Sequence, residues 1–242
     1  MGPLNRRKPG TRLSNSMLLF IIAGVIFLLM YGIAMISFPV SFRQFQTFFD
    51  FFNLNAALFI ATLGMCIVMI GGGIDISIGA VCGLVTMACA MLLQSGAGDI
   101  WGALFLALGI GLAFGLMHGF LIAYLEIQPF IITLAGMFLA QGLLTTLHKE
   151  PLNVTKPAFV ALRRFTIEIP WLGTVNRLGV FIPCEIKPSV IVVVALVVLY
   201  AALMKWSRFG RNLYAVGGNR QSARMLGVNV KKTIFLSYVL CG

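Results

Sequence analysis

A glycine-rich segment with one carboxylate, residues 71–79, is the part of this sequence most able to do chemistry. It reads Gly-Gly-Gly-Ile-Asp-Ile-Ser-Ile-Gly and stands between two long apolar runs. Three consecutive glycines disfavour a continuous helix because their backbone freedom is costly to lose. The segment therefore predicts a helix break, after which Asp75 can cap the next helix by accepting backbone N–H bonds.

Two functions fit this break. The simpler one is a turn at the membrane interface, with Asp75 as an ordinary cap. The other is a broken helix inside the bilayer that lines a path for cargo, because intramembrane carboxylates and unwound backbone form binding sites in transporters. In that case the pathway residues are Gly72, Gly73, Asp75 and Ser77. The residues alone leave both interpretations open.

A second candidate site lies in the basic stretch from Arg208 to Lys232. Gly217-Gly218-Asn219 is a turn signal that ends in a good N-cap residue, and it predicts a two-turn helix over residues 220–226. Gly227 suits the left-handed position that ends such a helix. Three residues, Ala223, Met225 and Leu226, give this helix an apolar side. Such a helix suits docking to a cytoplasmic partner, and a merely solvated basic loop is the alternative.

Motifs for catalysis, metal binding or nucleotide binding are missing from the sequence. It has no Walker-type glycine loop, no HExxH motif and no paired carboxylates within an apolar run. The five cysteines show no CxxC or Cys/His spacing, so we expect no metal, disulfide or cofactor in this chain. Near the end of the fourth apolar run, we expect interfacial positions for His118 and Glu126 rather than a proton relay.

The elements that must position these segments are membrane helices. The 242 residues are 60% hydrophobic and 10% charged, which excludes a disordered chain, a collagen-like fibre and a soluble nucleic-acid-binding domain. Since lipid offers no hydrogen bonds, long apolar runs must form helices. We therefore predict an all-α polytopic bundle, one transmembrane domain over 1–242. Its spans are 17–38, 54–70, 76–94, 100–123, 129–147 and 189–204, with a seventh beginning at 233.

The distribution of Lys and Arg predicts the orientation of this bundle. The head carries Arg6, Arg7, Lys8 and Arg12, and the coupling loop 205–232 carries seven basic residues and no acidic one. Six crossings separate the two segments, so the positive-inside rule places both, and the N-terminus, in the cytoplasm. The proline-rich stretch 148–188 is then a folded periplasmic loop without a long helix. Because the apolar run at the end stops at Gly242, we expect the chain to be the N-terminal part of a longer protein.

Small residues predict close helix packing. Three glycines, Gly111, Gly115 and Gly119, recur every four residues in the fourth run, and the third run carries Gly79 and Gly83. Glycines at this spacing let helix backbones approach each other in lipid.

Three motifs in this order resemble the permeases of bacterial ABC sugar importers of the ribose, xylose and galactofuranose group, most closely the galactofuranose type. They are Gly71–Gly79, Pro129-Phe-Ile-Ile-Thr-Leu-Ala-Gly-Met137 and Gly210-Arg-Asn-Leu-Tyr-Ala-Val-Gly-Gly-Asn219. The resemblance implies an inner-membrane subunit that imports a monosaccharide. Its implied partners are cytoplasmic ATPases that hold ATP and magnesium, a second identical or different permease subunit, a periplasmic sugar-binding protein, and lipid but no nucleic acid.

The resemblance also assigns the ATPase-coupling residues. Family coupling loops often read Glu-Ala-Ala-x-x-x-Gly, and the equivalent here runs from Gln221 to Gly227, so that Gln221 and Ser222 depart from the pattern while Ala223 and Gly227 match it. The flanking Gly217, Gly218 and Asn219 belong to the same element. A secondary transporter or channel without an ATPase is the alternative function, and an intramembrane enzyme is a third class that lacks a catalytic constellation.

Overall fold

The computed structural model describes residues 15–38, 44–148, 150, 152–175 and 181–242. The N-terminal basic residues that entered the orientation argument lie outside these residues. Contacts divide the chain into two units. One comprises Met1–Phe51 with Glu168–Glu185, and the other comprises Phe52–Ile167 with Ile186–Gly242.

Long apolar helices dominate the chain, which confirms the predicted helical membrane fold. Five are long and apolar enough to cross a membrane, judged by length and composition: α1 (Asn15–Ser37), α3 (Phe45–Ile70), α5 (Ile100–Ala123), α6 (Pro129–Leu147) and α8 (Pro188–Trp206). A sixth apolar helix, α4 (Ile78–Gln94), has 17 residues and is shorter. Helix α3 begins nine residues before the predicted boundary of its span at 54, because polar residues in its first turns lower the hydropathy without ending the helix.

Shorter elements connect these helices. They are α7 (Pro157–Arg164), β1 (Ile167–Val175), β2 (Phe181–Ile186), α9 (Arg208–Gly218), α10 (Arg220–Met225) and α11 (Val230–Cys241). The strands form a two-stranded sheet within the predicted periplasmic loop 148–188. This sheet departs from the all-α expectation, because the prolines of this stretch indicated only a loop. In the same stretch, the described helix α7 has eight residues.

In the first unit, side-chain hydrogen bonds join the start of α3 to β2. The amide Nε2 of Gln46 donates to Asp50 Oδ1 at 2.8 Å and to the carbonyl of Glu185 at 3.2 Å. Its Oε1 accepts from the backbone N–H of Glu185 at 2.8 Å. These bonds satisfy the polar residues of the early α3 turns and explain why the helix extends beyond the apolar run.

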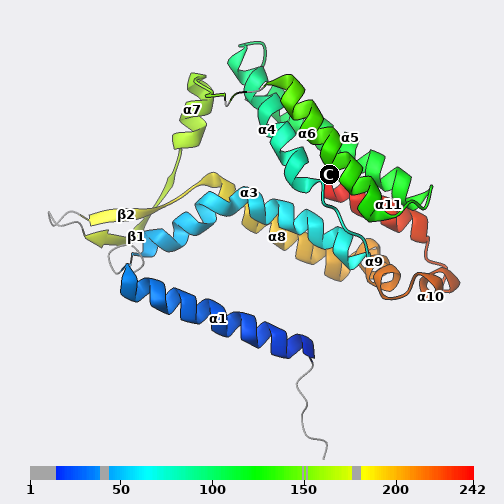
Figure 1. Ribbon diagram of the computed structural model, residues 1–242. Helices are drawn as coiled ribbons and strands as arrows, with labels where there is room; N and C mark the ends of the chain where they lie inside the picture. The colour runs from blue at the N-terminus through cyan, green and yellow to red at the C-terminus, as the bar shows by residue number, and fades with distance from the viewer. Residues whose placement is uncertain (1–14, 39–43, 149, 151, 176–180) are drawn as a thin grey trace, which may run out of the picture. The chain divides into compact units, whose positions relative to one another are not determined.

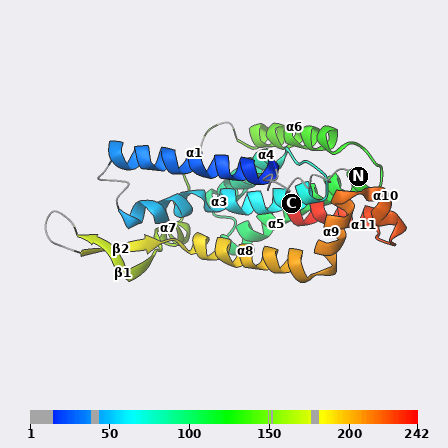
Figure 2. The same ribbon diagram turned by 90° about the horizontal axis from the view of Figure 1, so that it is seen from below.

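The second unit is built on pairs of packed helices. Helix α4 packs on α5 and α6, and α11 packs along α5 (Figure 1). A core cluster forms where α11 meets the ends of α3 and α5 and the helices α9 and α10, with Val68, Ile122, Val216, Ala223, Ile234 and Tyr238 among its buried members. Helices α9, α10 and α11 follow one another through short turns at this end of the unit (Figure 2).

Within the second unit, contacts join several of the interhelical segments that were predicted to lie on the cytoplasmic side of the membrane. The predicted cytoplasmic segments 71–77, 124–128 and 205–232 meet around the core cluster. On the other side, the Lys156 ammonium donates to the carbonyl of Gly98, and the backbone N–H of Lys187 donates to Asn53 Oδ1 at 2.8 Å. The predicted six-crossing orientation is therefore compatible with these contacts.

Candidate functional site

The glycine triplet ends α3 in a tight turn. Gly72 has a φ of +75°, a conformation that residues with a side chain rarely adopt. The N–H of Gly73 donates to the carbonyl of Val68 at 3.0 Å and closes the turn. A β-carbon on Gly73 would lie 2.5 Å from the Tyr238 hydroxyl oxygen, so this glycine allows α11 to approach the break. An extended segment then leads to α4.

Asp75 orders this extended segment but does not cap α4. Its Oδ1 accepts from the backbone N–H of Ser77 at 2.9 Å and from the Ser77 hydroxyl at 2.6 Å. The N-cap residue of α4 is Ser77 itself, without a side-chain cap bond. The predicted cap is therefore wrong, because the carboxylate closes a two-residue turn before the helix begins. Both side chains are buried, with 6% of Asp75 and 2% of Ser77 exposed.

Helix α11 holds the break from the other side. The Tyr238 hydroxyl donates to the carbonyl of Ile74 at 3.2 Å, and the Cys241 thiol lies 3.8 Å from Asp75 Oδ2. Sequence reasoning missed both residues, since they stand in an apolar run that was predicted only as the start of a span. A tyrosine in such a run was the available signal, because a buried phenol needs a hydrogen-bond partner.

The glycines of α5 form the contact with α11. A β-carbon on Gly115 would lie 2.8 Å from the carbonyl oxygen of Tyr238, and one on Gly119 would lie 2.8 Å from that of Phe235. Gly111 similarly faces the backbone of Gly242. The glycines of α4 lie elsewhere: Gly79 has nothing within 4 Å of a built β-carbon, and Gly83 makes only an ordinary contact with Leu144.

His118 lies buried in α5, with 1% of its surface exposed. Its Nε2 lies against Gly136 of α6, where a side chain would collide with the ring. In the part of the chain that the structure describes, this nitrogen has no hydrogen-bond partner.

The coupling segment is a pair of capped helices. Asn219 is the N-cap of α10, and its Oδ1 accepts from the N–H of Ser222 at 2.9 Å, as the sequence predicted. Gly227 has the predicted positive φ, +80°. The turn expected at Gly217-Gly218 is different, because these two glycines form the last residues of α9. The helix α9 itself was not predicted, although Ser207 caps it by accepting from Gly210 N–H at 3.0 Å.

Helix α9 rests on the end of α3, so the two glycine motifs meet. A β-carbon on Gly217 would collide with the carbonyl of Ile70, and the Cα of Gly217 lies 4.0 Å from a β-carbon built on Gly72. Leu213 of α9 is fully buried against Ile67 and Met204. The helix break and the coupling segment are therefore in direct backbone contact, although they lie far apart in the sequence.

Helix α10 has one buried and one exposed side. Ala223 is 1% exposed and belongs to the core cluster, whereas Met225 and Leu226 are 77% and 80% exposed. The prediction that Ala223 shares an apolar side with the other two is wrong, because its side of the helix packs on this chain. Gln221 and Ser222 are exposed with them. The surface that α10 offers to a partner therefore consists of exposed apolar tips and polar or basic side chains.

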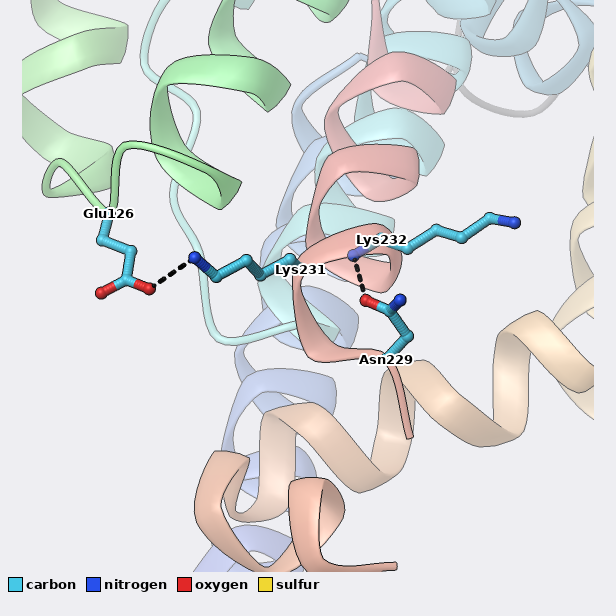
Figure 3. Close-up of polar contacts among 4 residues, drawn as sticks. All are labelled: Glu126, Asn229, Lys231 and Lys232. Atoms are coloured by element: carbon cyan, nitrogen blue, oxygen red, sulfur yellow. Dashed lines mark hydrogen bonds and ion pairs between the residues drawn. The ribbon is translucent and has the colours of Figure 1, made fainter. Parts of the chain in front are cut away.

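An ion pair joins the turn after α5 to the first turn of α11. The Lys231 ammonium lies 3.0 Å from Glu126 Oε1, and Glu126 has a φ of +56° (Figure 3). The hydrogen bond from Lys231, then the charges of Lys231 and Arg224, hold the pKa of the Glu126 carboxyl below its usual value. Asn229 caps α11 by accepting from the N–H of Lys232 at 3.0 Å. In the sequence, Lys231 was only one of the basic residues that indicate the cytoplasmic side, and this ion pair was not predicted.

Metal-ligand clusters are not formed by the described residues: no group of three or more His, Cys, Asp or Glu side chains among them could hold an ion. All five cysteines are free thiols.

Comparison with known proteins identifies relatives of this chain. The family profile for the permease component of branched-chain amino acid transport systems matches residues 47–242. The inner membrane ABC transporter permease protein YjfF of Escherichia coli (strain K12) is 32% identical over 215 residues, 89% of this chain and 61% of that protein. The fructose import permease protein FruG of Bifidobacterium longum (strain NCC 2705) is 30% identical over 232 residues, 96% of this chain and 66% of that protein.

A third relative is the galactofuranose transporter permease protein YtfT of Escherichia coli (strain K12), which is 32% identical over 200 residues, 83% of this chain and 54% of that protein. The chain spans about 60% of the length of the curated relatives it matches. No solved structure matches it significantly.

Proposed function

Since the chain belongs to the family of permease components of branched-chain amino acid transport systems, we propose that it is the membrane subunit of an ATP-driven sugar importer. It carries a monosaccharide across the bacterial inner membrane and performs no catalysis itself. Relatives named for fructose import and for galactofuranose transport support this class of cargo, and the galactofuranose type remains the one that its motifs resemble most.

The observation that supports this function most directly is the contact between α9 and the end of α3. A docking element that touches the helix break through backbone atoms can transmit movement from a cytoplasmic ATPase to the transport path. We propose that cytoplasmic ATPases bind the exposed side of α10, that a second permease subunit completes the path, and that a periplasmic sugar-binding protein delivers the cargo.

Removing the two exposed apolar tips of α10 tests the docking. The double variant Met225→Ala/Leu226→Ala should reduce co-purification of the ATPase with the permease, and reduce sugar uptake, by about tenfold or more, since a few side chains supply most of the binding energy of an interface and a loss of about 1.4 kcal/mol lowers the affinity tenfold. Both side chains are exposed, so membrane insertion should be unchanged. Trp171→Ala, a change at an exposed residue of β1, is the control and should retain the ATPase. Normal ATPase binding by the double variant would contradict the docking.

For the cargo path we propose Gly72, Gly73, Asp75 and Ser77, the residues of the break. Asp75→Asn tests whether its charge is needed, because an amide oxygen can still accept the two bonds from Ser77 while the negative charge is lost. We expect sugar uptake to fall sharply while the permease still assembles with its ATPase. Full uptake by this variant would reduce Asp75 to a residue that only orders the turn, whose loss costs about 1 kcal/mol.

A further inference from the structure

Resting on the proposed docking at α10, we propose that the pocket beside this helix binds a carboxylate side chain of the ATPase. We call it the basic pocket. It lies between α10, the turn after α5 and the first turn of α11, and has a volume of about 280 Å³. Its charged lining residues are Glu126, Arg220, Arg224 and Lys231.

Positive charge is in excess in the basic pocket. Of its three cations, Lys231 is paired with the single carboxylate, that of Glu126. Among the residues that the structure describes, neither Arg220 nor Arg224 has an ion-pair partner. The pocket therefore contains two guanidinium groups without an ion-pair partner among the described residues, and the planar fork of a guanidinium matches the geometry of a carboxylate.

The surrounding sequence cannot supply that carboxylate. The segment 205–232, which carries α9, α10 and the start of α11, contains no Asp or Glu. The position where related coupling loops often carry glutamate is Gln221 in this chain. In this contact the permease therefore contributes the cations and the ATPase contributes the acid.

Local geometry prepares the basic pocket for this ligand. Glu126 is held in a left-handed conformation, which a non-glycine residue adopts at a cost, and its bond to Lys231 keeps that lysine turned toward the pocket. Figure 3 shows the Lys231 and Lys232 side chains pointing to opposite sides of α11. Adjacent lysines thus differ in access to the pocket, and this makes Lys232 a natural control.

A protein ligand fits this surface better than a phospholipid headgroup. Met225 ends the short helix that carries the two arginines and Leu226 follows it, with 77% and 80% of their surfaces exposed. Apolar anchors beside charged groups are the composition of protein–protein interfaces, where arginine and methionine are enriched. A protein partner can bind the cations and bury both tips in one contact.

Carbodiimide cross-linking tests the proposal in the permease–ATPase complex. The reagent adds to a carboxylate to form an O-acylisourea. A neighbouring primary amine attacks its acyl carbon, forms an amide bond and releases the reagent as a urea, which a guanidinium does not do. Arg224→Lys keeps the charge and adds an amine, so we expect a covalent permease–ATPase product that maps to position 224 and to an Asp or Glu of the ATPase. Glu126→Gln removes the carboxylate that pairs with Lys231 in this chain. In that variant Lys231 should form an amide bond with the Asp or Glu of the ATPase, while Lys232 stays unlinked.

Charge reversal gives the second measurement. Arg220→Glu/Arg224→Glu should lower ATPase co-purification about tenfold or more, and salt up to about 0.5 M should no longer reduce it, because salt then screens a repulsion between like charges. The control Arg208→Glu/Arg211→Glu makes the same change in net charge on α9, outside the pocket, and should have a clearly smaller effect.

The outcomes separate the two proposals. If the wild-type permease retains no ATPase, the proposed function itself fails, and this inference with it. If the ATPase is retained but neither cross-link forms and the reversal of Arg220 and Arg224 changes nothing, the basic pocket is not a contact. Equal losses in both reversal variants would also overturn it, since they would indicate a diffuse basic surface. Loss of co-purified phospholipid with intact ATPase binding would identify a lipid site instead.

Discussion

Gly217→Ala is expected to lower sugar uptake about tenfold or more, whereas the neighbouring change Gly218→Ala has no effect. The two glycines end the same helix, α9, yet their surroundings differ. A β-carbon on Gly217 would collide with the backbone carbonyl of Ile70, whereas one on Gly218 has nothing within 4 Å. The obstacle at Gly217 is backbone, so it cannot rotate away, and α9 must shift off the end of α3.

The matched pair removes the ambiguity of a glycine substitution. Alanine stabilises a helix by up to about 1 kcal/mol relative to glycine, and this gain applies to both positions. Overpacking typically costs about 1–3 kcal/mol, and it applies only at Gly217. Uptake into cells or proteoliposomes should therefore fall about tenfold or more for Gly217→Ala alone, and coupling between ATP hydrolysis and uptake should be lost.

ATPase co-purification distinguishes the cause of that loss. Since Met225 and Leu226 are exposed and remain unchanged, the Gly217 variant should still bind the ATPase, and the bound ATPase should still hydrolyse ATP. Equal uptake by the two alanine variants would show that the contact between the coupling segment and the helix break carries no movement.

Local features of the coupling segment could be predicted because they depend on neighbouring residues alone. The cap at Asn219 and the left-handed Gly227 each follow from the side chains and turn geometry within a few residues. The contact of Gly217 with Ile70 could not, since it depends on how two segments distant in the sequence pack. The exposed side of α10 was misjudged at Ala223 for the same reason: a two-turn apolar pattern does not say which residues face the protein.

The helix break shows the same division. Three glycines and an aspartate predicted that α3 would end near Ile70, and it does. The role of Asp75 was misassigned because the sequence allows its carboxylate to accept from the first turn of α4 or from Ser77, and only the backbone path decides between them. The beginning of α3 was missed because the partner of Gln46 is Glu185. Glu185 belongs to β2, in a proline-rich stretch that was predicted only as a loop.

Gly115→Leu should strongly destabilise the packing of α5 on α11. A β-carbon at this position would already lie 2.8 Å from the carbonyl oxygen of Tyr238 and 3.1 Å from Cα of Val239. A leucine side chain must therefore separate the two helices, at a cost of at least the 1–3 kcal/mol typical of overpacking. In lipid, close backbone packing is itself the main attraction between helices, so this loss has no hydrophobic compensation.

Separation of these helices should also loosen the helix break, because Tyr238 of α11 donates to the carbonyl of Ile74. We expect a lower thermal unfolding midpoint in detergent, faster proteolysis of the segment 71–77 and loss of uptake. Gly109→Leu is the matched control on the same helix, because a β-carbon there has nothing within 4 Å. Both variants add the same hydrophobic side chain and gain the same helix propensity. If their midpoints fall equally, the cause lies in insertion or helix formation, and the glycine contact with α11 is not what stabilises the bundle.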